Sequence, residues 1–382
     1  MDLEAMHSVL AKVVGQPASA SMDLIRAQLD ADPVFQVLEQ NAYIRIGTGR
    51  SSTDTIQVAA WLFAQAQSED LDGLLERVDQ VLRTNRANAF AAAALEGIDC
   101  DQTIDLTEEL QLIPGGQVPQ RVGEDMISVQ RPKNLPPLPV GPRELHHTAA
   151  LIWRYEEHPV YTSSEEPLSD VVKLTDLYDV ASCLTALGGM APLPLAGWHD
   201  FEDPVPGMTG SMTVVHDPEI DLPRKFEPGP FDPENAQTIV QQYLRLDESS
   251  KDKLRIPLQR LNLALRRRQM EDRAIELGIA FESLLLADSG SNIDLTLRIG
   301  LRGALLLGGD ITVRRRHDRL LKNVYWVRSK AVHGGKVPQE CKGQRVEQIL
   351  SDGLDLCAAL LRTMISRGVP SESQWTDLQL GA

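Results

Sequence analysis

From Pro233 onward the sequence becomes an almost unbroken series of amphipathic helical segments, and this pattern constrains the fold more than any other feature. Apolar residues recur every three or four positions, so each segment has one face that must be buried. Short polar or glycine-containing turns such as Gly308-Gly309-Asp310 separate the segments. Short connections favour antiparallel neighbours, so residues 233–368 are predicted to form an up-down helical bundle, with a tail over 369–382. The predicted helices are Glu234–Leu246, Leu254–Met270, Arg273–Ala287, Asp294–Leu307, Thr312–Val332 and Arg345–Arg367.

Residues 1–130 are predicted to form a mixed domain that is mostly helical and ends in short strands. Leucines and valines recur at helical spacing between Glu69 and Leu82, which predicts a helix there. The alanine-rich stretch Ala87–Leu95 is predicted to continue as a second helix. Between Thr103 and Val118 the apolar period changes and a Pro-Gly-Gly follows, which indicates short strands with a turn.

Residues 131–232 are predicted to contain a connector and a small α/β segment. Five prolines between Arg131 and Pro142 exclude a helix or a central strand there. The elements expected after it are a strand within Leu145–Tyr161, a helix over Asp170–Leu187, and an irregular segment, Gly188–Asp232, with one strand around Met212–Val215. The predicted fold class is therefore an α+β N-terminal region followed by an all-α C-terminal helical bundle.

Positive charge is concentrated in one part of the chain. The net charge is −16, yet between Lys251 and Lys330 there are 17 Lys and Arg against 9 Asp and Glu, whereas the remainder has 21 against 45. A basic module attached to an acidic body is expected when one part of a protein meets a polyanion. The arginine triplets Arg266-Arg267-Arg268 and Arg314-Arg315-Arg316 are the candidate contacts. The alternative is that each triplet is only a solvated helix face.

Cysteine usage and the lack of long apolar runs point to a cytoplasmic protein. The four cysteines are scattered without a C-x-x-C pair, which argues against a disulfide framework and against a structural zinc site. The N-terminus is acidic, and no apolar run approaches the length that spans a bilayer. No membrane association is expected.

One segment, Asn323–Gly335, combines residue types suited to RNA cleavage. Arg328 supplies a permanent forked charge that matches a phosphate, and histidine, here His333, is the side-chain type that exchanges protons near neutral pH. Cleavage by the 2′-hydroxyl needs a base, an acid and positive charge on the phosphate. Arg328 and His333 are five residues apart, so on a regular helix they point about 140° from each other. One histidine per chain can serve as the base or as the acid, but the reaction needs both, so the chemistry favours a two-fold dimer.

This helical segment resembles the HEPN superfamily, in particular its ApeA-like domains from bacterial defence proteins. The shared pattern is an Arg, a few residues and a His, here Arg328-Ser-Lys-Ala-Val-His333, followed by glycine. The run Ala274–Leu286 resembles an earlier helix that carries an acidic residue, here Glu282. The run Thr296–Leu307 resembles the next, with Arg298 or Arg302 as a supporting cation. Ser329 departs from the Asn, Asp or His that often follows the arginine.

The resemblance implies a metal-independent, cofactor-free, dimeric endoribonuclease that serves as a toxin or antiviral effector. Arg328 would stabilise the phosphate, His333 would act as general base or acid, and Glu282 would orient it. RNA would be held by the two arginine triplets, by Arg298 and Arg302, and by Lys330. The uneven charge distribution alone, and not the resemblance, suggests that the acidic N-terminal region restrains the nuclease by covering its basic surface; this region could instead bind a trigger or regulator.

Three alternatives remain open from the sequence. His333 could cap its helix against a backbone carbonyl, and Arg328 could form a plain ion pair with Glu282, giving a non-catalytic dimerisation or RNA-binding module. Tyr325 and Trp326 could stack on bases, although their spacing favours the core or a dimer interface. A metal could bind acidic, histidine-containing loops around His199 and His216.

Overall fold

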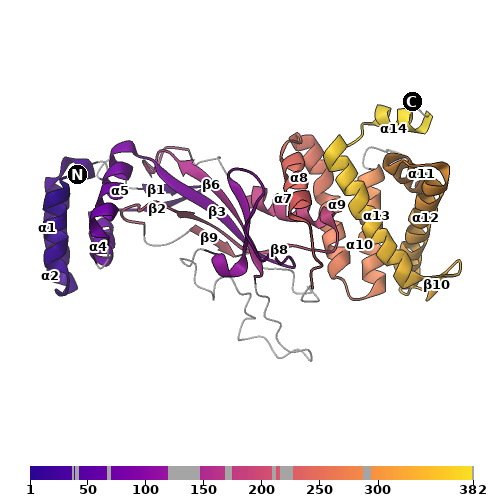
Figure 1. Ribbon diagram of the computed structural model, residues 1–382, viewed down its shortest axis with the longest axis horizontal. Helices are drawn as coiled ribbons and strands as arrows, with labels where there is room; N and C mark the ends of the chain where they lie inside the picture. The colour runs from indigo at the N-terminus through magenta and orange to yellow at the C-terminus, as the bar shows by residue number, and fades with distance from the viewer. Residues whose placement is uncertain are drawn as a thin grey trace, which may run out of the picture.

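The computed structural model describes residues 1–36, 38, 43–66, 70–118, 147–167, 174–208, 212–215, 227–286 and 294–380. The molecule is elongated, with the N-terminal helices at one end, a β-sheet in the middle and a helical bundle at the other end (Figure 1). The predicted division into an α+β N-terminal region and a helical C-terminal region is therefore confirmed. The predicted connector Arg131–Pro142 lies outside the described residues.

Among the described residues, four α-helices and a small sheet form the N-terminal end. Aspartates cap the first turns: the side chains of Asp2, Asp54 and Asp70 each accept a backbone N–H three residues on. The helix predicted over Glu69–Leu82 is confirmed as α5. The elements are α1 (Leu3–Val13), α2 (Ala18–Ala31), the 3-10 turn η1 (Pro33–Gln36), α4 (Thr55–Gln65), α5 (Leu71–Thr84) and the antiparallel strands β1 (Tyr43–Ile46), β2 (Gly49–Ser52) and β7 (Tyr161–Thr162).

The central sheet has six antiparallel strands in the order β4-β5-β6-β3-β8-β9. The short strands predicted between Thr103 and Val118, and those predicted around residues 145–161 and 212–215, are confirmed in kind. Strand β8 was not predicted, since its segment was expected to be irregular. The strands are β3 (Ala87–Glu96), β4 (Ile104–Asp105), β5 (Leu110–Pro114), β6 (Ala149–Glu157), β8 (Leu193–Phe201) and β9 (Met212–Val215).

The prediction of a helix over Ala87–Leu95 is wrong, because this segment is the long inner strand β3. It pairs with β6 on one side and β8 on the other along almost its whole length. Helix propensities differ by less than about 1 kcal/mol per ordinary residue, so pairing with two strands overrides them. Burial of both faces also hides the period-two pattern that would mark a half-exposed strand.

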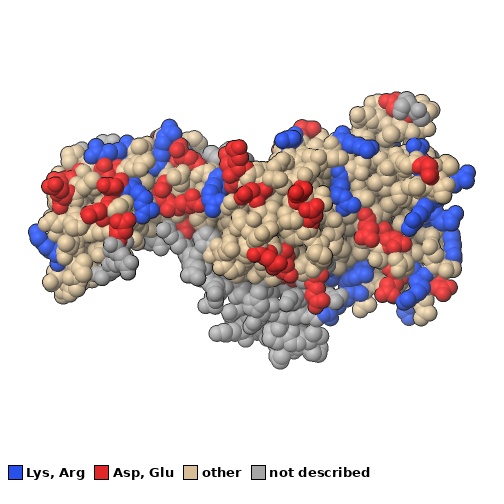
Figure 2. All heavy atoms as spheres, viewed as in Figure 1, with Lys and Arg blue, Asp and Glu red and all other residues tan. Residues whose placement is uncertain are grey.

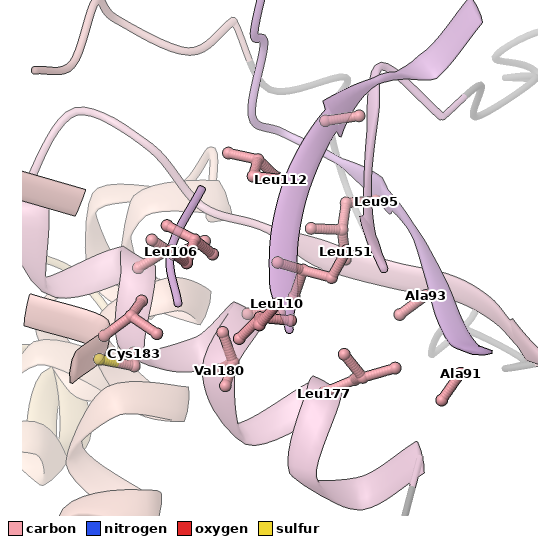
Figure 3. Packing of buried hydrophobic residues seen from close by; sticks show 14 of the residues in the cluster. Ala91, Ala93, Leu95, Leu106, Leu110, Leu112, Leu151, Leu177, Val180 and Cys183 are labelled. Atoms are coloured by element: carbon pink, nitrogen blue, oxygen red, sulfur yellow. The ribbon is translucent and has the colours of Figure 1, made fainter. Parts of the chain in front are cut away.

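Alanine is useful in β3 because a helix lies close against one of its faces. Helix α7 (Leu174–Leu184), followed by the 3-10 turn η3 (Thr185–Leu187), packs on this face. In Figure 3, Leu177 of α7 lies toward Ala91 and Ala93 of β3, and Val180 lies beside Leu110, all within one buried cluster. The other face forms a smaller separate cluster around Phe90 and Trp198.

The C-terminal bundle confirms all six predicted helices, with ends that differ by at most six residues. Gly353 of the last long helix allows close packing, since a Cβ there would lie 2.8 Å from Val324 Cγ2 and 3.0 Å from Leu277 Cδ2. The helices are α8 (Pro233–Leu244), α9 (Glu248–Arg266), α10 (Met270–Leu286), α11 (Leu295–Leu307), α12 (Ile311–Gly334) and α13 (Val346–Arg367), with a small hairpin of β10 (Glu340–Cys341) and β11 (Gln344–Arg345) before α13.

The segment predicted as a tail contains one more helix, α14 (Glu372–Leu380). It packs against α11 through Trp375, which is only 3% exposed. Among the described residues, no helix combines the length and the apolar character needed to cross a membrane.

Candidate functional site

The candidate site forms where α10 and α12 run antiparallel to each other. Arg328 of α12 donates from Nη2 to Oε2 of Glu282 on α10 at 3.4 Å. The Tyr325 hydroxyl donates to the other carboxylate oxygen of Glu282 at 2.8 Å. The Arg328 guanidinium also lies over the Tyr325 ring, 5.6 Å from its centroid. The structure therefore brings together two of the three predicted catalytic residues, and it adds Tyr325.

A glycine on α10 makes room for the arginine. A Cβ at Gly278 would lie 2.4 Å from Arg328 Cγ and 3.1 Å from Arg328 Cβ. The aliphatic part of Arg328 therefore lies directly on the α10 backbone, and its guanidinium reaches Glu282 one turn further along α10. Any larger residue at position 278 would displace the arginine.

The ion pair between Arg328 and Glu282 is partly exposed to solvent. The side chains of Arg328 and Glu282 are 23% and 27% exposed. At this exposure an ion pair contributes about 1 kcal/mol or less to stability, because water screens it. The charged groups are thus held in place while a phosphate approaching from solvent could still reach the guanidinium.

Tyr325 is a hydrogen-bond donor over the whole ordinary pH range. Burial, the hydrogen bond to Glu282 and the charge of that carboxylate raise the pKa of Tyr325 to about 12. The phenol therefore stays protonated and keeps its proton directed at Glu282. Sequence reasoning assigned Tyr325 to the core or an interface, although its position three residues before Arg328 places both on one side of the helix.

His333 lies on the exposed last turn of α12. Gly335 ends the helix: it takes the left-handed conformation, with φ +62°, and its N–H bonds to the Ala331 carbonyl. Across the described parts of the chain, His333 makes no hydrogen bond or ion pair, so no backbone carbonyl satisfies its ring there. Within one chain it is joined neither to Arg328 nor to Glu282.

The predicted RNA-binding cations divide into exposed and buried sets. Figure 2 shows Lys and Arg side chains along the end of the molecule formed by α11 and α12. Arg298 is half-buried on α11, and Arg267 pairs with Glu276 at 3.0 Å. The exposed members are Arg268, Arg314, Arg315, Arg316 and Lys330.

Arg266 must be removed from the predicted RNA-binding set, because it is buried at the junction of the bundle and the sheet. Its guanidinium pairs with Glu96 at the end of β3, with Nη1 2.6 Å from Oε2. It also donates to the backbone carbonyls of Glu96 and Ala191. The glycine after Glu96 leaves the space for this contact, since a Cβ at Gly97 would overlap the guanidinium.

Arg302 is likewise an interior residue and not a surface cation. It donates to the carbonyl of Leu285 at 2.8 Å, in the last turn of α10. It also pairs with Glu372 at 3.2 Å and lies 4.9 Å from the ring centroid of Trp375. Arg302 therefore fastens α14 to α10 and α11, so any effect on the candidate site would be indirect.

The metal site considered around His199 does not form in the way predicted. His199 belongs to strand β8, is 1% exposed, and shares a 3.0 Å hydrogen bond between its Nδ1 and the Tyr155 hydroxyl. Burial lowers the pKa of His199 to about 4. His216 lies outside the described residues. Among the residues that are described, no group of three or more His, Cys, Asp and Glu is arranged to hold a metal ion.

The fold and site define an α+β region joined to a helical bundle that carries one half-exposed Arg-Glu-Tyr cluster and one exposed histidine. No protein-family model, curated protein or solved structure matches the chain.

Proposed function

We propose that this chain is a cytoplasmic, metal-independent endoribonuclease of the HEPN type that acts as a homodimer through its helical bundle. The biological role proposed with it is that of a toxin or antiviral effector. The observation that carries the proposal is the state of the two groups on α12: Arg328 is held half-exposed by Glu282, whereas His333, five residues later, is exposed and unpaired among the described residues.

In the proposed reaction a 2′-hydroxyl of RNA attacks the adjacent phosphorus and the 5′-oxygen leaves. One His333 takes the hydroxyl proton, and His333 of a second chain gives a proton to the departing oxygen, which leaves a 2′,3′-cyclic phosphate and a 5′-hydroxyl. Arg328 stabilises the charge that develops on the phosphate. Glu282 and Tyr325 keep the guanidinium oriented until the phosphate competes for it.

The test is a cleavage assay with purified protein on single-stranded RNA in the presence of EDTA. Wild-type protein is expected to leave 2′,3′-cyclic phosphate ends. His333→Ala and Arg328→Ala are expected to lower the rate by at least 100-fold while the folded state and the dimer persist. Unchanged cleavage in both variants would refute the proposed site.

A second candidate function is a non-catalytic HEPN-like module for dimerisation or RNA binding. The observation in its favour is that Arg328 already has an acidic partner within its own chain. RNA binding without cleavage by the wild-type protein would select this candidate. Cleavage that disappears with His333 would exclude it.

We further propose that the N-terminal region receives a trigger or regulator. In Figure 1, α1 and α2 lie at the opposite end of the molecule from α12, so in this conformation they do not cover the basic bundle surface. Regulation would therefore pass through the junction of sheet and bundle, where Arg266 and Glu96 meet. Substitutions at that junction that leave cleavage and toxicity unchanged would argue against it.

A further inference from the structure

The outer face of α12 carries a row of basic and aromatic residues that ends at His333. Leu321, Val324, Val327 and Ala331 form the buried face of this helix. On the opposite face lie Arg315, Arg319, Trp326, Lys330 and His333, which we name the α12 row. Because each residue advances by about 100° around the helix, these five side chains fall within a sector of about 60°. Arg328 lies about 140° away from His333.

Its cations have no acidic partners within the part of the chain that the structure describes. Arg315 and Arg319 are exposed and take part in no hydrogen bond or ion pair there, and Lys330 lies only over the Trp326 ring, 5.4 Å from its centroid. Acidic residues are not scarce, because the chain has 54 Asp and Glu against 38 Lys and Arg. Among the described residues, none of these acidic side chains is placed against Arg315, Arg319 or Lys330.

The spacing and chemistry fit one nucleic-acid strand. From Arg315 to His333 the helix rises by about 27 Å, enough for several nucleotides. Trp326, which is half-buried, lies between the two arginines and Lys330. Cations that follow a backbone, with an aromatic ring between them on which a base can stack, are typical of single-strand binding. A paired base cannot present its face to a side chain in this way.

We infer that the α12 row is a binding track for single-stranded RNA that delivers a phosphodiester to His333. This inference rests on the proposed nuclease function and specifies its substrate class. In the bound state Lys330 would move from the Trp326 ring to a phosphate, and a base would take its place on the ring. Arg328, around the side of the helix, would meet the strand only at the scissile phosphate.

The experiment measures binding of a labelled 12-nucleotide RNA by fluorescence anisotropy over a series of salt concentrations. All proteins carry His333→Ala, so that binding is observed without cleavage. Single-stranded RNA is expected to bind at least tenfold more tightly than a duplex of the same sequence. Removing both arginines, by Arg315→Ala and Arg319→Ala, is expected to lower the slope of log K against log salt by about 1.4, or 0.7 for each phosphate that the protein no longer neutralises.

Two further variants examine the aromatic position. Trp326→Leu removes the stacking surface and is expected to weaken binding by about 5- to 100-fold. Trp326→Phe keeps a ring and is expected to lose much less, which separates stacking from a general packing defect. The matched control is Arg26→Ala with Arg77→Ala, two exposed arginines of α2 and α5, which should leave affinity and salt slope unchanged.

If the row variants and the control bound single-stranded RNA with equal affinity, the proposed binding track would be refuted. A preference for duplex RNA would also refute it. A change in oligomeric state by light scattering, without a change in RNA binding, would assign the row to an interface between copies instead. Cleavage is measured separately in proteins that retain His333. Single-strand binding without cleavage would refute the nuclease but keep the track, whereas cleavage unaffected by the row variants would refute the track alone.

Discussion

Tyr325 connects the two charged groups of the candidate site in two different ways. Its hydroxyl donates to Glu282, and its ring lies beneath the guanidinium of Arg328. The carboxylate is thereby shared between a neutral donor and a charged donor, which limits its freedom to rotate. In the reaction proposed above, a phosphate would draw Arg328 away, and Glu282 would keep the hydrogen bond from Tyr325 as its one remaining donor.

Replacing Tyr325 by Phe tests this positioning role. The ring and its cation contact remain, and only the hydrogen bond to Glu282 is removed. Because that bond is partly exposed, the free energy of unfolding is expected to fall by about 1 kcal/mol. The cleavage rate at saturating RNA is expected to fall about tenfold, with a smaller change in KM.

A purely structural role for Tyr325 would lower stability without this split between kcat and KM. Tyr243→Phe, which removes a buried hydroxyl on α8, is the matched control and should leave both kinetic constants unchanged. The measurements are steady-state cleavage kinetics and urea unfolding for both variants.

His199 is expected to make the free energy of unfolding depend on pH. Its pKa is about 4 in the folded chain, whereas an unfolded histidine has its ordinary value of 6.5. The unfolded state therefore binds more protons between these two values, so stability is fully present above pH 6.5 and falls as pH drops toward 4. The loss is expected to be on the order of 3 kcal/mol.

Urea unfolding at several pH values measures this dependence in wild type and in His199→Gln. The glutamine variant cannot take up the proton, so its stability should fall less between pH 6.5 and 4. Parallel pH profiles for the two proteins would contradict the assignment.

At the level of elements, amphipathic pattern predicted the helices of the bundle and failed for the central strand. In α12 and α13 the apolar stripe is visible because one face of each helix meets solvent. In β3 the neighbours that decide the structure, β6 and β8, are distant in the sequence, and both faces are buried. No local pattern in an alanine run records those distant partners.

The same reasoning explains the errors among the cations. A sequence pattern placed Arg266 in a basic triplet, but its partner Glu96 lies 170 residues earlier in the chain. The pairing of Glu282 with a cation could be predicted, because a carboxylate in an apolar run needs a partner and the resemblance supplied one. Tyr325 was missed because aromatic residues at helical spacing usually belong to a core.

Helix α14 is held by one aromatic residue and one arginine, and this arrangement yields a prediction. Trp375→Ala removes the ring beneath Arg302 and the main apolar contact of α14. Truncation of a buried tryptophan costs about 3–5 kcal/mol when the site is well packed. The expected result is local detachment of α14, detected by mass spectrometry as rapid protease cleavage after Arg367 and release of the C-terminal segment.

The bundle should keep its structure in this variant, because α14 lies outside the long helices that form it (Figure 1). Trp153→Phe, at a half-buried position in β6, is the control and should leave the C-terminal segment protected. Equal protection in wild type and Trp375→Ala would show that other contacts hold α14.

At the scale of the whole molecule, polar contacts from α9 and α13 join the bundle to the middle of the chain. Asn262 donates to Thr185 Oγ1 at 3.1 Å and to the Pro192 carbonyl at 2.8 Å. Arg362 donates to the carbonyls of Ala186 and Leu187. Together with Arg266, these contacts tie two helices of the bundle to the turn η3 and to the end of the central sheet.

A double-substitution cycle on Arg266 and Glu96 tests whether this junction makes the two regions unfold together. The two side chains are 1% and 2% exposed. Burial lowers the pKa of Arg266, and the charge of Glu96 opposes this effect. Arg266→Met or Glu96→Leu alone leaves one buried charge unpaired and is expected to cost about 3–5 kcal/mol. The double variant places two apolar groups together and should recover most of that loss.

Urea unfolding followed by helical circular dichroism and by tryptophan fluorescence measures the cycle. Wild-type protein should unfold in one transition by both signals, whereas each single variant should separate them, because the sheet and the bundle are then no longer joined by this pair. The control is Arg255→Met, which removes a second α9 contact, the pair with Asp179 at 2.8 Å. Arg255 is 49% exposed, so its removal should cost about 1 kcal/mol or less. If Arg266→Met were no more damaging than Arg255→Met, the buried pair would not couple the two regions, and a signal from the N-terminal region would need another route to the candidate site.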